Sequence, residues 1–212
     1  MADRYTATRS YGGVSAEART AARRERLIDA AIHLFGTQGY AATGVKELCR
    51  EAGVTDRYFY ESFRDRAELF AATFDRIVGE LLEAVGSAAL VEPRTPEHQA
   101  RAAVDAFIRT VTADRAKARV LFLEAGVVGG DFGREVRAST RRFAELITTA
   151  ARPHLPPDVP DRRLAMGSLS LIGAMGIVVL EWLDGELDAT VEDLTDHFVN
   201  LLLAAGEAGT RG

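Results

Sequence analysis

The stretch Thr43–Phe63, TGVKELCREAGVTDRYFYESF, decides the fold of this chain because it contains the spacing of two short helices joined by a tight turn. In its first half, apolar residues recur at helical intervals and predict one buried stripe. These residues are Val45, Leu48, Cys49 and Ala52. Gly53 is placed to end the first helix, because glycine adopts the left-handed conformation without strain. Two short helices around a glycine-bearing turn are typical of a helix-turn-helix.

The second helix of this unit has an inward face of phenylalanines and an outward face suited to DNA. Thr55 is the candidate N-cap, and its hydroxyl is expected to accept a hydrogen bond from an amide of the first turn. The outward side chains are charged or phenolic, and they belong to Asp56, Arg57, Tyr58, Tyr60 and Glu61. An α-helix fits the major groove, where arginine binds a guanine edge with two parallel hydrogen bonds. The pattern therefore predicts a DNA-reading helix, with simple surface packing as the alternative for either tyrosine taken alone.

A longer run around this stretch, from Arg23 to Phe70, resembles the N-terminal DNA-binding domain of the TetR family of transcriptional regulators. The matching residues occur in the order of the family pattern: Leu34, Phe35, Gly39, Tyr40, Thr43, Val45, Ala52, Gly53, Val54, Phe59, Tyr60, Phe63, Arg64, Arg66, Leu69 and Phe70. The resemblance implies an all-α protein of about nine helices. An N-terminal three-helix helix-turn-helix DNA-binding domain would precede a C-terminal helical ligand-binding and dimerisation domain.

The same resemblance assigns candidate DNA contacts residue by residue. The candidate base contacts are Lys46, Asp56, Arg57 and Tyr58. The candidate phosphate contacts are Thr43, Thr55, Tyr60 and Arg66. Two positions depart from the family pattern: Gly44 replaces a hydroxyl residue and so removes one phosphate donor, and Cys49 replaces the usual alanine. A buried, inert thiol is expected at Cys49. Glu61 would be unfavourable near DNA unless Arg57 or Arg64 pairs with it.

Composition and charge indicate a soluble globular protein with a mildly basic N-terminal part. The chain has 212 residues, 47% of them hydrophobic and 27% charged. Up to Arg66 there are 11 Lys and Arg against 9 Asp and Glu, and the remainder has 15 against 22. This distribution lets phosphate attraction act locally although the net charge is -5. One cysteine and the absence of an apolar signal segment predict a reducing, cytoplasmic setting.

The order of segments along the chain predicts three parts. Residues 1–15 read as a flexible arm, residues 16–66 as the helix-turn-helix domain, and residues 67–212 as the helical effector-binding and dimerisation domain. Arg4 and Arg9 of the arm offer contacts to an adjacent minor groove, with simple disorder as the alternative.

Further helix signals follow the helix-turn-helix. Capping patterns predict helix starts at Asp65 and at Thr95, the latter followed by proline. Two more helices are expected over 119–128 and 133–152.

The segment Leu164 to Leu180 contains no charged residue. A membrane span is one interpretation, because its length approaches the required 20 or so residues. Its serines and glycines, and the Glu181 that follows, favour a soluble helix buried on most sides.

In the resembled family the last two helices of each subunit form a four-helix dimer interface, so a homodimer is expected. Two reading heads would then meet half-sites about 34 to 36 Å apart or a multiple of that.

No catalytic or metal-binding motif is recognisable, so the sequence predicts no enzyme, no cofactor and no metal site. The resemblance implies a small-molecule pocket in the C-terminal domain, with an ordinary core as the alternative. Its candidate lining residues are Phe107, Thr110, Phe122, Glu124, Phe143 and Met175. The expected function is a repressor that an unknown small hydrophobic effector releases from double-stranded operator DNA. The alternatives are a transcriptional activator, and an all-helical small-molecule-binding protein or enzyme with a vestigial helix-turn-helix.

Overall fold

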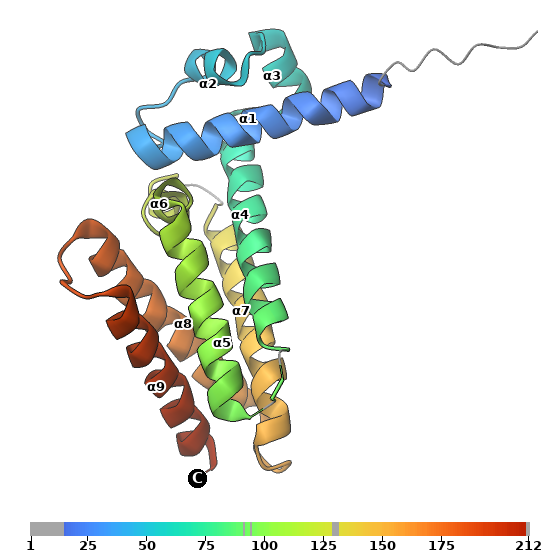
Figure 1. The fold of residues 1–212 in the computed structure, drawn as a ribbon. Coiled ribbons are helices and arrows are strands. Elements are labelled where there is room, and N and C mark those ends of the chain that lie inside the picture. Colours follow the sequence, from blue (N-terminus) through green and yellow to red (C-terminus); the bar gives the residue numbers. More distant parts are fainter. Residues whose placement is uncertain (1–14, 91, 94, 129–131, 211–212) are drawn as a thin grey trace, which may run out of the picture.

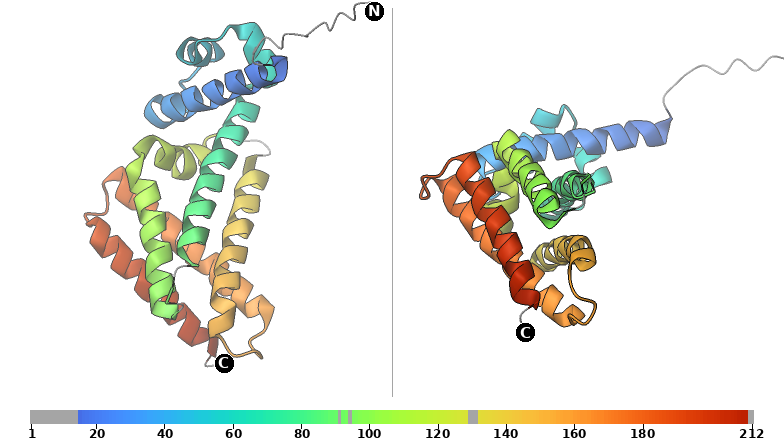
Figure 2. Two further views of the ribbon diagram at one scale, coloured as in Figure 1. Left: turned by 45° about the vertical axis from the view of Figure 1, so that its right-hand side comes forward. Right: turned by 60° about the horizontal axis from the view of Figure 1, so that its bottom comes forward.

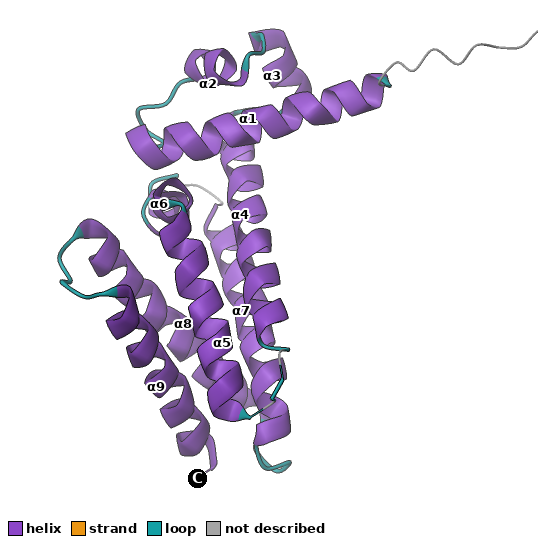
Figure 3. Cartoon of the chain, in the orientation of Figure 1, coloured by secondary structure: helices purple, strands orange, loops and turns teal. Residues whose placement is uncertain are grey.

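Every regular element of the described chain is helical. The computed structural model describes residues 15–90, 92–93, 95–128 and 132–210. The α-helices in chain order are α1 (Ala16–Gln38), α2 (Val45–Ala52), α3 (Asp56–Ser62), α4 (Arg66–Ala88), α5 (Pro96–Ala113), α6 (Arg115–Phe122), α7 (Gly133–Ala151), α8 (Asp161–Asp184) and α9 (Val191–Thr210). Two single 3₁₀ turns are η1 (Glu124–Gly126) and η3 (Arg152–His154). This all-helical architecture confirms the predicted fold class (Figure 3).

The first three helices form a small head at one end of the molecule. α2 and α3 both pack on α1, which lies across the first turns of α4 (Figure 1). The head core consists of side chains that the spacing along α1, α2 and α3 places inward, and all of them are buried: Leu27, Phe35, Leu48, Phe59 and Phe63. Phe70 of α4 joins this core, so α4 belongs to the head at its start and to the body beyond it.

The body is a bundle of the remaining helices. α4 packs against α5 and α7, α5 packs against α9, and α8 packs against α7 and α9 (Figure 2). A second core cluster holds these helices together and includes Leu81 of α4, Val104 and Ile108 of α5, Val179 of α8 and Phe198 of α9. The first cluster extends from the head to Val120 of α6 and to Phe132, so the head rests on the body through a shared core, and α4 contributes to both clusters.

Capping residues explain where three helices begin. The Oδ1 atom of Asp65 accepts a hydrogen bond from the N–H of Glu68 at 2.8 Å, and this contact lowers the pKa of Asp65. The Thr95 hydroxyl accepts one from the N–H of His98 at 3.3 Å, with proline as the next residue after the cap. Both caps confirm the sequence prediction. Ser15 caps α1 in the same way, by accepting from the N–H of Ala18 at 3.0 Å, whereas Arg4 and Arg9 lie outside the described residues.

The segment after α5 differs from the prediction. A single helix over 119–128 is wrong, because α6 begins earlier, ends at Phe122 and is followed by the separate turn η1. The early start has a local cause: the Oδ1 atom of Asp114 accepts hydrogen bonds from the N–H groups of Ala116 and Lys117, at 2.9 and 3.2 Å. The turn that follows α6 directs Glu124 toward the head.

Helix α8 is also less buried than the sequence predicts. By length and composition alone it is apolar enough to cross a membrane, yet only 22% of its apolar window is buried inside the chain. Met166 and Ile177 are each 64% exposed, and Leu169 and Gly173 are exposed on the same face. We call these four residues the α8 stripe. A Cβ atom built on Gly173 would meet nothing within 4 Å, so packing inside one chain does not explain this glycine.

Candidate nucleic-acid interface and ligand cavity

The turn between α2 and α3 has the geometry that its glycine predicts. Gly53 has φ of 62° and ends α2 in the left-handed conformation. Its N–H donates to the carbonyl of Arg50 at 3.2 Å, and the N–H of Val54 donates to that of Cys49 at 2.9 Å. Thr55 occupies the N-cap position of α3, but its side chain makes no capping hydrogen bond, so that part of the prediction is wrong. Its exposed hydroxyl stays available to another acceptor or donor.

The outward face of α3 presents the predicted polar groups to solvent. Arg57, Tyr58 and Tyr60 are exposed, and Lys46 is exposed on the neighbouring first turn of α2. The Nε atom of Arg57 donates to the Oε1 atom of Glu61 at 2.9 Å. This ion pair neutralises the one acidic side chain whose position near DNA is unfavourable, and it orients the guanidinium along the helix.

Two arginines of α1 extend this surface, and the sequence reading missed both. The guanidinium of Arg23 lies 4.2 Å from the centroid of the Tyr58 ring. Arg23 and Arg26 also line a hollow of about 260 Å³ beside Thr55 and Tyr58. Residues three apart share one face of a helix, and this spacing of two arginines in α1 was the signal available in the sequence. Their charges add to the positive potential at the start of α3.

Cys49 and Asp56 meet underneath the turn. Burial, followed by a hydrogen bond to the neighbouring Asp56 carboxylate, raises the pKa of the Cys49 thiol to about 11. The thiol is therefore protonated at neutral pH, and the nucleophilic thiolate is scarce. Asp56 is exposed at the first residue of α3, so one side of its carboxylate serves the turn while the other faces solvent.

Thr43 and Arg66 support the loop between α1 and α2. Thr43 is fully buried, and its hydroxyl donates to the carbonyl of Gly39 at 2.8 Å. The Nη1 atom of Arg66 donates to the carbonyls of Tyr40, at 3.0 Å, and of Thr43, and its guanidinium lies over the Tyr40 ring. The Thr43 hydroxyl has no access to solvent, so we do not propose Thr43 as a phosphate contact. Arg66 is half-buried and committed to two carbonyls, so we do not retain it as a phosphate contact either.

Glu124 connects the body to the same loop. Its side chain is turned away from the body, and the residue is only 7% exposed. The Oε2 atom accepts a hydrogen bond from the N–H of Tyr40 at 2.8 Å. The Nη2 atom of Arg119 lies 3.9 Å from Oε1 and provides the nearest positive charge in the described part of the chain. Glu124 is thus a contact between η1 and the head.

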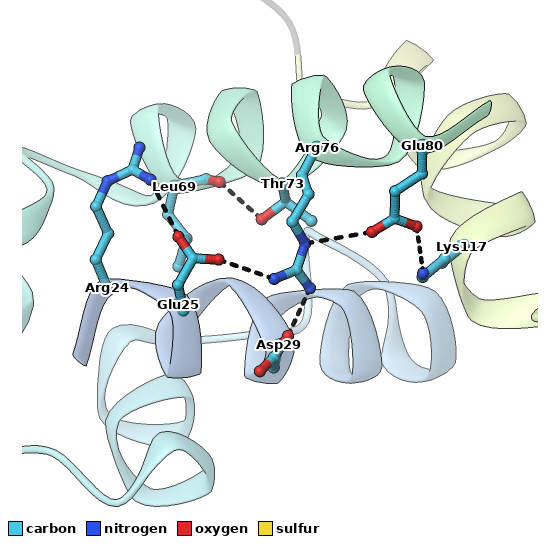
Figure 4. Close-up of polar contacts among 8 residues, drawn as sticks. All are labelled: Arg24, Glu25, Asp29, Leu69, Thr73, Arg76, Glu80 and Lys117. Carbon is cyan, nitrogen blue, oxygen red and sulfur yellow. Dashed lines mark hydrogen bonds and ion pairs between the residues drawn. The ribbon is translucent and has the colours of Figure 1, made fainter. Parts of the chain in front are cut away.

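A second set of contacts fixes α1 on α4 and α6 (Figure 4). Arg76 of α4 pairs with Glu25 at 3.2 Å and with Asp29, both on α1. Its Nε atom also lies 3.9 Å from Glu80, which in turn binds Lys117 of α6. The alternating charges hold three helices in one arrangement. Any movement of α4 or α6 must therefore move α1 or break these ion pairs.

The body contains a cavity of about 1160 Å³ between α4, α5, α7, α8 and α9. Four of the predicted pocket residues line it, namely Phe107, Phe122, Phe143 and Met175. Thr110 does not line it, and its hydroxyl donates to the carbonyl of Ala106 at 2.8 Å. Glu124 does not line it either, because it points to the head. The two polar residues expected in the pocket therefore do not face this cavity.

One wall of the cavity is continuous with the head. Leu121, Phe122, Ala125 and Gly126 line the cavity, while Glu124 between them reaches Tyr40. On the α4 side, Phe132 lines the cavity and its ring lies 5.0 Å from the ring of Phe70 in the head core. A molecule in the cavity would press on both of these connections.

Comparisons with known proteins match both parts of the chain. Residues 27–73 match the model of bacterial regulatory proteins of the tetR family, and residues 96–205 match that of the tetracyclin repressor-like C-terminal domain. The transcriptional activator FasR of Mycolicibacterium smegmatis is 30% identical over 125 residues, which cover 59% of this chain and 57% of FasR. The chain thus aligns with less than two thirds of that relative. The transcriptional regulator BetI of Rhizobium meliloti is 26% identical over 88% of this chain and 92% of its own.

A solved structure has the same fold. The transcriptional regulator FadR of Bacillus subtilis, solved in complex with stearoyl-CoA, superposes with a TM-score of 0.74. The alignment covers 85% of this chain and 98% of FadR, at 16% sequence identity. At this identity the likeness concerns the arrangement of the helices.

Proposed function

The chain belongs to the TetR family of DNA-binding transcriptional regulators, which are not enzymes, and from this we propose that it is a repressor released from its operator by an effector. One observation carries the proposal: the cavity and the reading head share the wall around η1, where Glu124 meets Tyr40. Binding of an effector in the cavity and placement of the head for DNA binding would then require different positions of η1. Such a regulator acts in the cytoplasm, where it meets DNA and effector together.

The DNA-reading role rests on the exposed face of α3. Arg57, Tyr58, Asp56 and Lys46 are proposed to read base edges, and Thr55 and Tyr60 to contact phosphates. Arg23 joins them as a further phosphate contact, because it stacks on Tyr58 beside the first turn of α3. The ion pair between Arg57 and Glu61 would open or rotate when the guanidinium engages a base.

A homodimer is proposed because one head covers only one half-site. The α8 stripe supports it, since it is an exposed apolar surface on a helix that the chain itself covers poorly. Three of its residues, Leu169, Gly173 and Ile177, also line the cavity, whereas Met166 does not. Gly173 within the stripe would allow the same helix of a second copy to approach closely. The two heads would then be carried by one rigid body with a fixed separation.

The proposed mechanism couples the cavity to that separation. An effector that fills the space between Phe122, Phe132 and α4 favours an arrangement in which α4 and η1 are displaced. The contacts of Arg76 and Glu124 pass this displacement to α1, and the two heads lose the half-site spacing. The effector acts only through its difference in affinity for the two states, and such coupling is typically about 1 to 3 kcal/mol.

Transcriptional activation is the second candidate, supported by the likeness to the activator FasR. Selection of genomic fragments by the purified protein would identify the operator and test DNA reading. Transcription in vitro from the selected promoter, with and without the protein, would then separate the two: a repressor lowers transcript yield and an activator raises it. Failure to select any sequence above random at low ionic strength would contradict both.

A further inference from the structure

We propose that the cavity binds a long-chain amphiphile with an anionic head group, and that Arg137 holds this head group. The inference rests on the proposed function in one respect, namely that the cavity takes the effector. It adds the chemical class of that effector, its orientation and the residue that selects its charge.

The cavity runs along the whole length of α7. The α7 residues that line it recur every three or four positions, from the first residue of the helix to the last: Gly133, Val136, Arg137, Ser139, Thr140, Phe143, Leu146, Ile147, Ala150 and Ala151. At the rise of an α-helix this face is about 27 Å long. Between its ends the lining is almost wholly apolar, with Phe107, Phe143 and Met175 facing the same space. An extended hydrocarbon chain fits this shape better than a compact ligand does.

The end of the cavity at the start of α7 carries a positive charge. Arg137 is the only Lys or Arg among the described lining residues, and it forms no ion pair in the described part of the chain. Its guanidinium nitrogens lie 3.8 and 3.9 Å from the position of a Cβ atom on Gly133, so the side chain folds back toward the first residue of α7. A cation near the N-terminus of a helix opposes the helix dipole. The helix dipole therefore does not favour the guanidinium in this position, whereas an anionic ligand in the cavity would.

The opposite end excludes an anion. Glu97 at the start of α5 lines it. The polar groups beside it are already engaged, because the Oε1 atom of Gln99 hydrogen-bonds His154 and its Nε2 atom donates to the carbonyl of Ala89 at 2.8 Å. An anionic head is repelled there and attracted at Arg137. The hydrocarbon tail therefore points toward Gln99 and His154.

Calorimetric titration of the purified, DNA-free protein tests the ligand class. The probes share one chain length and differ in the head: myristate, myristoyl-coenzyme A, myristyl alcohol and tetradecyltrimethylammonium. We expect one or both of the anionic probes to bind at least about tenfold more tightly than the alcohol, and the cationic probe to bind weakest. Tighter binding of only one anionic probe identifies the size of the head group and supports the proposal. Equal binding of the acid, the thioester and the alcohol would overturn it.

Variants on one helix test the assignment to Arg137. Arg137→Gln should weaken the anionic probe about tenfold and leave the alcohol unchanged, and Arg137→Lys should restore most of the affinity. Arg141→Gln is the matched control, because Arg141 is an exposed arginine one turn further along α7 that does not line the cavity. Equal losses in the two glutamine variants would show that Arg137 acts only through the general charge of the helix.

Chain length provides a separate readout of the elongated cavity. From octanoate to palmitate, each added methylene that enters the apolar lining should tighten binding about fourfold. Affinity that is independent of chain length would contradict an extended tail along α7. Operator binding is measured on the same preparation. If the protein binds its operator but none of these probes, the proposed ligand class is wrong and the proposed DNA-binding function stands. If it binds the probes but no DNA, the ligand class stands and the DNA-binding function is wrong.

Discussion

Glu124 accepts a hydrogen bond from the backbone N–H of Tyr40 at 2.8 Å, although the two residues are 84 positions apart in the sequence. Tyr40 is fixed from the other side as well, since its carbonyl accepts from Arg66 of α4 and its ring lies 5.4 Å from those of Phe35 and Phe70. The loop between α1 and α2 is thus held at once by the body, by α4 and by the head core. A change at η1 or at the start of α4 can therefore reach the head through Tyr40.

Removal of the Glu124 carboxylate tests whether this contact transmits the effector signal. Glu124→Ala leaves a buried N–H without its acceptor and should lower the free energy of unfolding by about 1 to 3 kcal/mol. It should also reduce the ratio of operator affinities measured without and with effector, because η1 no longer pulls on Tyr40. Urea denaturation gives the first quantity, and fluorescence anisotropy with labelled operator gives the second.

Glu124→Gln is the matched control, because its amide oxygen can still accept from Tyr40. It should preserve most of the affinity ratio. A ratio that stays at the wild-type value in Glu124→Ala, despite the lower stability, would mean that the contact is structural and that the signal passes through α4 alone.

Gly39 beside this contact should tolerate no side chain. Its φ of 92° lies in the region that L-residues rarely adopt, and a Cβ atom there would sit 3.4 Å from both carboxylate oxygens of Glu124. Gly39→Ala should therefore destabilise the fold by about 1 to 3 kcal/mol. Gly44→Ala is the control, since Gly44 has φ of −97° and open space around it. Thermal unfolding should show a clear loss for the first variant and little change or a small gain for the second.

The sequence could predict those parts of the fold that depend on local pattern. Apolar spacing and capping residues identify α2 to α5, since the hydroxyl or carboxylate at Thr95 or Asp65 acts within one helical turn. Gly53 likewise ends α2 through local hydrogen bonds. Its N–H donates to Arg50, three positions earlier, and the N–H of Val54 donates to Cys49, five positions earlier. Such signals extend over only a few residues, so they can be recognised in a short segment of the sequence.

Contacts between distant segments were not predictable in the same way. Glu124 stands among apolar residues, so the sequence suggests a polar anchor in the pocket, and only the turn after α6 directs it to the head instead. The family resemblance makes Thr43 a candidate phosphate contact. Its burial was not predictable from the sequence, because it depends on how the loop folds over α1. For α8, the apolar pattern predicts burial on most sides, but only 22% of its apolar window is buried within the chain.

The contribution of Arg57 to base reading is testable by substitution. Arg57→Ala should cost about 1 to 3 kcal/mol of binding to the selected operator and relax preference at one base position, if its guanidinium makes a bidentate contact with guanine. The measurement is a competition assay against operators changed at single positions. An unchanged order of preference would show that Arg57 reads no base.

Arg23 serves as the contrast for this experiment, because a phosphate contact carries no sequence information. Arg23→Ala should weaken binding to all sequences by a similar factor and reduce the slope of log affinity against log salt by about 1. A change of base preference in this variant would place Arg23, or the Tyr58 ring that it covers, in the groove.

The cap at Asp65 predicts a dependence of stability on pH. The N–H of Glu68 stabilises the carboxylate and lowers its pKa from 3.8, so the folded state favours the ionised form. This contribution is fully present above pH 3.8 and is lost as pH falls through the lower folded-state pKa. Asp65→Ala should lose about 1 kcal/mol at neutral pH, and Asp65→Asn, which still caps, should lose less. Denaturation at a series of pH values checks this: the gap between wild type and Asp65→Ala must shrink in acid, and a constant gap would contradict it.

The α8 stripe predicts which surface holds two copies together. Met166→Glu places a charge on a 64% exposed apolar position of the α8 stripe that does not line the cavity, which costs little in the monomer and a large desolvation penalty in an interface. Sedimentation velocity should show a shift from dimer to monomer, with operator affinity reduced because the two heads are no longer linked. Leu90→Glu is the control, since Leu90 is equally exposed at the end of α4 but lies off the stripe. If Leu90→Glu dissociates the protein and Met166→Glu does not, the dimer forms through another face, and the head spacing must be derived from that face instead.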